Sequence, residues 1–302
     1  MIIQETTIIL KPERKMKQYF NLLLIAVALC GLSASPCRAQ QYTEPYLTDE
    51  TRPNGLNWLP DPPELTSAAF TYDFYYYQLG RQLREVDGVG ELALSDESAA
   101  LMDVFSEVLG INLSYETTPE IVQLAERATN DAHKANSVVK KHYQRVRPFA
   151  QFKEPSLKPE TDEEEAATYS YPSGHSSRGW MYALALASVA PECAENLFLR
   201  AHAYANNRVI CGHHWKSDTD ASLMLAAGIF ATVVSTDEYR AQLVKAREEY
   251  LRLKGDPTAV RSAQTRAATG SAAIFDLQGR RLDTAPTAPG IYITDGQKKA
   301  VK

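Results

Sequence analysis

Apolar residues recur at helical spacing through most of the chain between residues 64 and 260. The clearest stripe runs from Ile121 to Val139, with apolar side chains three or four positions apart, as on one face of an α-helix. A Thr-Pro-Glu start at 118–120 suits a helix N-terminus, so this stripe predicts one long helix that ends near Tyr143. No run of alternating apolar residues interrupts the pattern, which predicts an all-α core. The other helices expected from the pattern cover residues 65–84, 96–109, 176–190, 195–209, 215–234 and 236–254.

Two stretches of this helical region differ from the rest in composition. Residues 70–77 hold six aromatic side chains, which we expect to lie in the core. Residues 151–168 carry two prolines and a run of acids at 162–165. We expect these residues to form a solvated loop that crosses the mouth of a ligand site as a lid, with its acids exposed to solvent.

The N-terminus has the pattern of a targeting segment. A basic stretch, an apolar stretch and two small residues, Cys37 and Ala39, precede Gln40. This order is typical of a secretory signal peptide over residues 1–39, and the apolar run is too short to span a membrane. We therefore expect a periplasmic or secreted protein, with residues 40–63 as an extended N-terminal arm.

The C-terminal residues 261–302 begin with a polar, linker-like stretch and continue with short β-like apolar runs. Asp276–Arg280, Gly290–Tyr292 and the terminal Lys-Lys-Ala-Val-Lys resemble a shortened C-terminal sorting tail of the type IX secretion system. The alternative is a small accessory hairpin on the preceding domain. We expect residues 64–260 to form the helical domain.

The composition indicates the size of the domain, its net charge and whether its cysteines can form a disulfide. The 302 residues are 44% apolar and 23% charged, which suits one globular domain with a sizeable core. The net charge of −5 gives no reason to expect a nucleic-acid partner. An exported chain can form disulfides, and Cys193 and Cys211 are the cysteines that follow the predicted cleavage site. They either pair or remain as two buried thiols.

The candidate chemistry begins at a Pro-Ser-Gly-His turn. Ser173, Gly174 and His175 stand at the start of a predicted helix, where unpaired N–H groups and the helix dipole favour an anion. A histidine in that place can hold or transfer a proton near neutral pH. Taken alone, the turn is equally well explained as a helix cap with an incidental surface histidine.

Two flanking motifs favour the functional interpretation. Lys140 is followed, after six residues, by Arg147 and a proline. Arg208 is followed by His214 and then, four residues later, by Asp218. This ordered set resembles the type 2 phosphatidic acid phosphatase superfamily. The residues around the last two motifs resemble its bacterial class A non-specific acid phosphatases.

The resemblance extends over residues 59–253 and implies a compact helical bundle of the type 2 phosphatidic acid phosphatase and vanadium haloperoxidase kind. Phosphoryl transfer needs donors for the phosphate oxygens, a nucleophile in line and a proton for the leaving oxygen. The motif residues supply these parts without a metal or another cofactor. The residues expected to bind the phosphate are Lys140, Arg147, Ser173, Gly174 and Arg208.

Three further side chains are expected to carry the catalytic steps, and the resemblance implies the same roles. His214 is the candidate nucleophile, and Asp218 would hold one imidazole nitrogen protonated and aim the other at phosphorus. His175 would protonate the leaving alcohol and then activate water. His213 is the alternative nucleophile, although the spacing to Asp218 and Arg208 favours His214.

Several neighbouring residues are interpreted differently. A zinc site made of His213, His214 and nearby acids lacks the usual ligand spacing, so we expect no metal. Asn207 stands where the family usually has Ser before its second Arg, which would change how the phosphate or Arg208 is positioned. The histidines expected to be structural are His133, His142 and His202.

These observations predict an exported, metal-independent acid phosphatase that hydrolyses phosphomonoesters through a phosphohistidine intermediate. Its partners would be small soluble phosphate esters such as nucleotides and sugar phosphates. The mature chain would have no membrane span, and its oligomeric state stays open. The alternatives are a lipid phosphate phosphatase, a vanadate-dependent haloperoxidase with the same oxyanion pocket, and a non-catalytic binding protein that keeps the fold.

Overall fold

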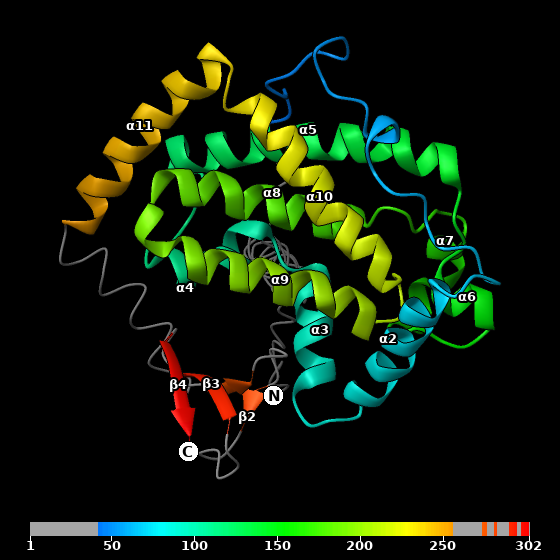
Figure 1. Cartoon of the computed structure of the whole chain (residues 1–302). Helices are drawn as coiled ribbons and strands as arrows, with labels where there is room; N and C mark the ends of the chain where they lie inside the picture. The colour runs from blue at the N-terminus through cyan, green and yellow to red at the C-terminus, as the bar shows by residue number, and fades with distance from the viewer. Residues whose placement is uncertain (1–41, 256–273, 277–280, 283–289, 295–296, 302) are drawn as a thin grey trace, which may run out of the picture. The chain divides into compact units, whose positions relative to one another are not determined.

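The structure is a computed structural model of the chain, shown in Figure 1. It describes residues 42–255 and, further along the chain, residues 274–276, 281–282, 290–294, 297–301. The predicted signal peptide over residues 1–39 and the predicted start of the linker at residue 261 lie outside the described residues.

Helices are the regular secondary structure of residues 42–255, which confirms the predicted all-α core. Three short 3-10 turns, η1 (Gly55–Asn57), η2 (Pro159–Thr161) and η3 (Pro191–Cys193), accompany the α-helices. The α-helices described in this range are α2 (Phe70–Leu83), α3 (Val89–Ser98), α4 (Leu101–Leu109), α5 (Pro119–Tyr143), α6 (Pro148–Phe152), α7 (Asp162–Ala166), α8 (Gly174–Val189), α9 (Ala194–Ile210), α10 (Lys216–Val233) and α11 (Asp237–Lys254).

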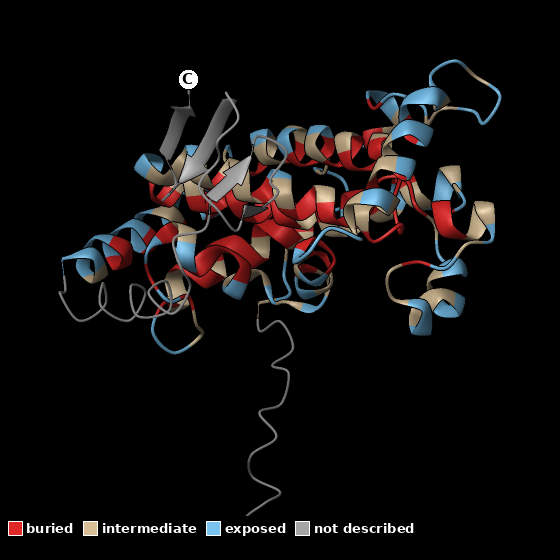
Figure 2. Ribbon diagram, turned by 90° about the horizontal axis from the view of Figure 1, so that it is seen from below, coloured by how far each residue is buried: buried red, intermediate tan, exposed pale blue. Residues whose placement is uncertain are grey.

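Helix α8 lies at the centre of this bundle and packs against α5, α9 and α10 (Figure 1). Buried residues are concentrated in the middle of the bundle, and exposed residues lie on its outer helices (Figure 2). Its apolar residues Met181, Ala183 and Leu186 are fully buried. Small residues let the neighbouring helices approach closely: a Cβ atom added at Gly179 would lie 2.6 Å from the ring of Tyr204 on α9. The helix that starts at the Pro-Ser-Gly-His turn is therefore held on several sides.

Helix α5 shows the predicted stripe, with two differences. Its apolar residues from Ile121 to Val139 are mostly buried, but Val138, expected on the stripe, is 48% exposed. The Thr118 hydroxyl does not cap the helix as the sequence suggests. It donates to the Ser114 carbonyl and accepts the Ser114 N–H, which closes the turn before the helix.

The aromatic run of α2 is only partly in the core, so the expectation of a buried run is wrong. Tyr77 is 1% exposed, whereas Tyr72, Phe74 and Tyr75 are 46%, 42% and 59% exposed. Successive residues of an α-helix are rotated by about 100°, so chain neighbours cannot share one face. The face that packs inward carries Asp73 beside Tyr77, which places a carboxylate inside the bundle.

The helix predicted to begin at Asp96 is in fact two helices. Two extended residues, Ala99 and Ala100, separate α3 from α4. Asp96 is buried near the end of α3, where it accepts hydrogen bonds from Arg200 and Asn207 of α9. These bonds tie α3 to the helix that carries Arg208.

The N-terminal residues 42–63 run along α5 and contain only the short turn η1. The backbone N–H groups of Tyr46 and Leu47 donate to the carboxylate of Asp131 on α5, at 2.7 and 3.1 Å. Asp131 is fully buried, so these two bonds satisfy a charged group that would otherwise destabilise the core.

The described C-terminal residues form strands, as the β-like runs predict. They make an antiparallel sheet in the order β2-β1-β3-β4. The strands are β1 (Ile274–Asp276), β2 (Arg281–Leu282), β3 (Gly290–Thr294) and β4 (Gln297–Val301).

The two cysteines of the described region are both free thiols. Of the two predicted alternatives, the disulfide is therefore absent, and of the two thiols only Cys211 is buried, whereas Cys193 is half-buried. Burial raises the pKa of the Cys211 thiol to about 12. No single helix among the described residues is long and apolar enough to cross a membrane. Helices α10 and α11 reach that threshold only as a pair bent by 96°.

Candidate active site

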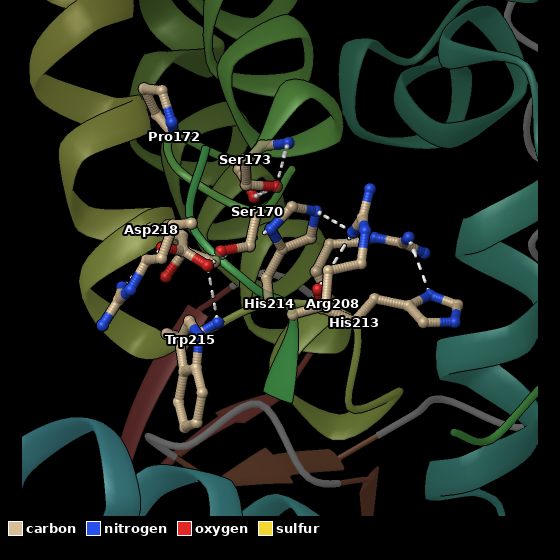
Figure 3. Close-up of polar contacts among 12 residues, drawn as sticks. Ser170, Pro172, Ser173, Arg208, His213, His214, Trp215 and Asp218 are labelled. Atoms are coloured by element: carbon tan, nitrogen blue, oxygen red, sulfur yellow. Dashed lines mark hydrogen bonds and ion pairs between the residues drawn. The ribbon is translucent and has the colours of Figure 1, made fainter. Parts of the chain in front are cut away.

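The turn between α9 and α10 carries the third sequence motif (Figure 3). Arg208 lies in the last turn of α9, and the chain then reverses through Gly212, whose φ of +82° favours glycine. His213 and His214 follow, and α10 starts directly after Trp215. Arg208, His213 and His214 are all buried, so the turn points into the bundle and not into solvent.

His214 lies between a carboxylate and an arginine. Its Nδ1 is 3.4 Å from Asp218 Oδ2, and its Nε2 is 3.1 Å from Arg147 Nη1. Because a guanidinium can only donate, Nε2 is the unprotonated nitrogen, and the proton on Nδ1 faces the carboxylate. Burial, and then Arg147, lower the pKa of His214 well below its ordinary value, which keeps the ring neutral.

Asp218 is fixed by its own helix and by Arg145. It accepts the backbone N–H of Trp215 at 2.8 Å, as a carboxylate in the first turn of a helix commonly does. Its other oxygen accepts from Arg145 Nη1 at 2.6 Å. The second terminal nitrogen of Arg145 donates to Asp73 of α2 at 2.7 Å. Arg145 thus bridges two buried carboxylates, and although burial raises the pKa of Asp218, the arginine opposes that shift.

Ser173 caps α8 and keeps its own proton available. Its Oγ accepts the Ser176 N–H at 3.3 Å and the Ser176 hydroxyl at 2.9 Å. Since Oγ is the acceptor in both bonds, the Ser173 hydroxyl can donate to a ligand. The Ser173 N–H donates to the Asp218 carbonyl at 3.2 Å, which joins the starts of α8 and α10. A Cβ at Gly174 would lie 3.8 Å from Lys140 Cε, so the glycine leaves space beside that lysine.

Lys140 lies in the last turn of α5, and its Nζ donates to the Tyr169 carbonyl. Burial, and then the nearby Arg147, lower the pKa of Lys140 to about 7. A lysine in this environment is charged at acid pH and loses its charge above neutrality.

Every side-chain nitrogen of Arg147 is already bonded. Nη1 donates to the His213 carbonyl at 3.0 Å and contacts His214. Nη2 donates to the Thr168 hydroxyl at 2.8 Å and pairs with Glu165 Oε2 at 2.7 Å. Nε donates to the Glu165 carbonyl at 3.0 Å. The arginine is therefore held by the segment that includes α7.

Arg208 has donors that no described residue accepts. Its Nη2 donates to His213 Nδ1 at 2.9 Å, whereas Nε and Nη1 have no hydrogen-bond partner in the described part of the chain. The Glu97 carboxylate of α3 lies 3.4 Å from Nη1, as an ion pair. Unsatisfied donors on a buried arginine are well suited to an anion.

His213 supports Arg208 and does not contact Asp218. Its Nδ1 accepts from Arg208, and its ring packs edge-on against Phe149 with 5.7 Å between the ring centroids. Burial, and then the neighbouring arginines, lower the pKa of His213 to about 2. These contacts favour a role for His213 as a neutral acceptor that holds Arg208 in place, and they do not favour its alternative role as the nucleophile.

His175 stands in the first turn of α8 on the side of α3. Its Nε2 lies 3.3 Å from the Glu97 carbonyl, and its ring lies near that of Tyr204. Burial, and then Arg208 and Arg178, lower the pKa of His175 well below its ordinary value. The ring gains a proton at acid pH, and an anion bound nearby would make that proton easier to hold.

Residues 151–168 contain more secondary structure than the solvated loop that the sequence predicts. The end of α6, the turn η2 and α7 all lie within them. The acidic run at 162–165 forms α7, in which Asp162 accepts a backbone N–H and Glu165 pairs with Arg147. The expectation of solvent-exposed acids is wrong for these two, because the buried guanidinium attracts one carboxylate and a turn recruits the other.

Sequence comparisons place this geometry in a family. The PAP2 superfamily matches residues 128–242. A non-specific acid phosphatase of Providencia stuartii is 36% identical over 213 residues, which cover 69% of this chain and 86% of the relative. A non-specific acid phosphatase of Salmonella typhimurium is 33% identical over 211 residues, 68% of this chain and 84% of the relative. An acid phosphatase of Zymomonas mobilis is 29% identical over 232 residues, 75% of this chain and 87% of the relative.

The chain belongs to the PAP2 superfamily, among its non-specific acid phosphatases. It is therefore a phosphoric monoester hydrolase, the enzyme class that the sequence predicts. In this acid phosphatase, the predicted site residues come from the end of α5, the residue that precedes α6, the start of α8, and the end of α9 with the turn into the start of α10. Those residues are Lys140, Arg147, Ser173, Gly174, His175, Arg208, His214 and Asp218.

Other residues of the acid phosphatase that the sequence singled out lie outside this cluster. Asn207, the departure from the family pattern, donates to Asp96 at 2.7 Å and so joins α9 to α3. His133, His142 and His202 are exposed on α5 and α9. Among the described residues, no three His, Cys, Asp or Glu side chains are grouped so that they could hold a metal ion.

Sequence reasoning missed four charged residues of the site. Asp73 is a single acid within an aromatic run, and Arg145 stands two residues before Arg147, so both left a signal that could have been followed. Glu97 left none, because it lies in a polar stretch that looks like ordinary solvent-exposed surface. Glu165 is marked only as one of the acids at 162–165, which the sequence predicts to be exposed to solvent.

Proposed function

We propose that this acid phosphatase is an exported enzyme that hydrolyses small soluble phosphomonoesters through a phosphohistidine on His214, without a metal ion. The observation that carries the proposal is the orientation of His214. Its protonated nitrogen faces Asp218, and its unprotonated Nε2 faces the cationic side of the site. That is the orientation a nucleophilic imidazole requires.

Cationic side chains supply the charge that the transferred phosphoryl group needs. Lys140, Arg147 and Arg208 each carry nitrogen donors, and the hydroxyl of Ser173 and the first N–H groups of α8 add neutral donors. Two nitrogens of Arg208 have no described acceptor, so they can bind phosphate oxygens without first breaking another hydrogen bond. In this proposal these groups take the place of a metal ion.

His175 gives up a proton in the first chemical step and takes one back in the second. In the first step, His214 Nε2 forms a bond to phosphorus, the ester P–O bond breaks, and the leaving oxygen takes a proton from His175. In the second step, water gives a proton to His175 and attacks phosphorus, and the P–N bond breaks to release phosphate and neutral His214. Because burial lowers the pKa of His175, its protonated form requires acid pH, which agrees with an acid phosphatase.

The proposals of export and of substrate class rest on sequence patterns and not on the geometry of the site. The basic, apolar and small-residue pattern of residues 1–39 is that of a secretory signal, and the tail after residue 261 resembles a sorting signal. An enzyme outside the cytoplasm meets soluble esters such as nucleotides and sugar phosphates. We therefore prefer these substrates to lipid phosphates.

Hydrolysis of p-nitrophenyl phosphate with EDTA present is the direct test of the metal-free mechanism. We expect activity to be unchanged by the chelator and to be inhibited by vanadate, which mimics five-coordinate phosphorus. His133→Ala, which alters an exposed histidine outside the site, serves as a control and should retain full activity. Loss of activity in EDTA with recovery on adding zinc or magnesium would overturn the proposal.

A further inference from the structure

We propose that Glu165 of α7 is an internal competitor of the substrate: its carboxylate holds the Arg147 guanidinium, and a bound phosphate must displace it. The inference rests on the proposed function, since it takes Arg147 as a phosphate ligand. It adds a residue that sets the affinity of the site for phosphate and the ease of product release.

The contact between Glu165 and Arg147 is made at two points. Oε2 of Glu165 lies 2.7 Å from Nη2, and the Glu165 carbonyl accepts from Nε at 3.0 Å. The Thr168 hydroxyl donates to the same carbonyl at 2.8 Å and accepts from Nη2, so the segment closes around the arginine. The Arg147 side chain is only 7% exposed. A carboxylate on a buried guanidinium is a strong, charge-assisted contact of the kind a phosphate would make.

Arg208, the other arginine expected to bind phosphate, is not held by a hydrogen-bonded carboxylate. Glu97 lies 3.4 Å from Arg208 Nη1 without a hydrogen bond, and Arg208 keeps two nitrogens that no described residue accepts. A phosphate can therefore bind Arg208 without displacing a hydrogen-bonded side chain. To bind Arg147 Nη2 as well, it must take the place of the Glu165 carboxylate.

Helix α7 is built so that Glu165 can leave at little cost. The helix has five residues, and none of them is buried. The ion pair between the Glu165 carboxylate and Nη2 is the contact that a phosphate must break. The Arg147 bonds to the Glu165 carbonyl and to the Thr168 hydroxyl, and the bond from the Ser156 N–H to Asp162, can remain. After the reaction, the carboxylate can return to Arg147 and help to expel the phosphate product.

The consequence for affinity follows from the competition. The apparent dissociation constant of a ligand rises by the inverse of the fraction of protein in the binding-competent state. If Glu165 holds Arg147 for most of the time, removing the carboxylate lowers the dissociation constant of phosphate. We expect a change of about tenfold, the order of magnitude of one charge-assisted hydrogen bond.

The experiment compares Glu165→Gln and Glu165→Ala with Glu164→Gln. The first removes the charge and keeps the shape, and the second removes every side-chain acceptor. The third makes the same charge change one residue away, on an exposed acid of the same helix. Binding of inorganic phosphate and vanadate is measured by titration calorimetry at fixed pH and salt, together with KM and kcat for p-nitrophenyl phosphate. Thermal unfolding checks that each variant is folded.

We expect both Glu165 variants to bind phosphate and vanadate about tenfold more tightly, with a lower KM and stronger product inhibition. Glu164→Gln should bind within twofold of the wild type. Unchanged or weaker binding in the Glu165 variants overturns the proposal, as does an equal gain in Glu164→Gln, which would indicate general electrostatics. A wild type that neither binds phosphate nor hydrolyses the ester would overturn the proposed function, and the competitor role with it.

Discussion

At the scale of single residues, each arginine of the site has a carboxylate beside it. Arg145 pairs with Asp218, Arg147 with Glu165, and Arg208 with Glu97. All three arginines lie at least partly inside the bundle, where an unpaired charge is costly, so the acids allow a strongly cationic site to fold. We propose a different use for each pair: Asp218 orients His214, Glu165 competes with the ligand for Arg147, and Glu97 leaves donors of Arg208 open.

We expect Arg145 to be a positioning residue, because it donates to Asp218, whose other oxygen faces His214. We expect Arg145→Met to lower kcat for p-nitrophenyl phosphate by about 10- to 100-fold, as loss of a second-layer partner commonly does, while KM changes much less. Arg145→Lys should recover part of the activity, and Arg240→Ala, which removes an exposed arginine of α11, should have no effect. Steady-state kinetics on the folded variants decides, and an unchanged kcat in Arg145→Met would contradict the role.

Lys140 makes phosphate affinity depend on pH. Its pKa is lowered to about 7, first by burial and then by Arg147, so it is charged below that pH and neutral above it. Because only the charged form attracts phosphate, inhibition by phosphate should weaken as pH rises from 6 to 8, by up to about tenfold per unit.

Lys140→Gln is the comparison that isolates this effect. It lacks the titrating group, whereas the ionisation of phosphate itself affects both proteins alike. The inhibition constant of phosphate for Lys140→Gln, divided by that for the wild type, should therefore fall toward one as pH rises. A ratio that stays constant from pH 6 to 8 would show that Lys140 does not titrate in this range.

At the scale of elements, sequence patterns predicted the bounds of helices better than they predicted which face of a helix is buried. The spacing of apolar residues located α8, α9, α10 and α11 to within two residues at each end, because a buried stripe and its caps are local features. The exposure of Tyr75 and the burial of Asp73 were not predicted, because they depend on which face of α2 meets the bundle. That face is held by residues distant in the sequence: Arg145 and Ser217 donate to Asp73, and Phe152 packs against Tyr77.

Two tyrosines of α2 provide a matched test of this difference. Tyr77 is buried, packs against Phe152 and donates to Glu154 at 2.6 Å, whereas Tyr75 is 59% exposed. Tyr77→Ala should lower the free energy of unfolding by about 3–5 kcal/mol, as truncation of a large core side chain does. Tyr75→Ala should change it by less than about 1 kcal/mol. Equal losses, measured by denaturant unfolding, would show that the aromatic run acts as one cluster.

At the scale of the whole molecule, catalysis and sorting are expected to be separable. The predicted site residues all precede residue 220, and the last described helix of the bundle ends at Lys254. The C-terminal strands pair with one another in a sheet of their own. We expect a chain that ends at Val260 to keep its melting temperature and activity, and to change only its location in the native host. Loss of several degrees or of most turnover would show that the tail belongs to the catalytic fold.

The site was predictable where it follows motifs and hidden where it follows tertiary contacts. The motifs predict His175, His214 and Asp218 at helix starts and turns. In the structure, the Ser173 N–H donates to the Asp218 carbonyl, so the segments that carry the second and third motifs are in contact. No local pattern marks Glu97, and the acidic run that contains Glu165 does not indicate an arginine partner, since each residue joins the site only when α3 or α7 meets an arginine from elsewhere. A residue whose partner lies on another helix can therefore be recognised only once the fold is known.

The central claim is that His214 carries the phosphoryl group, and trapping that group tests it most directly. The enzyme is mixed with a phosphate-labelled ester, quenched in alkali within milliseconds because phosphohistidine is acid-labile, and digested for mass spectrometry. The account predicts label on His214 in the wild type, with His175→Ala slowed and His214→Ala unlabelled and inactive. Label on His213 or any other residue, or turnover that survives in His214→Ala, would contradict it.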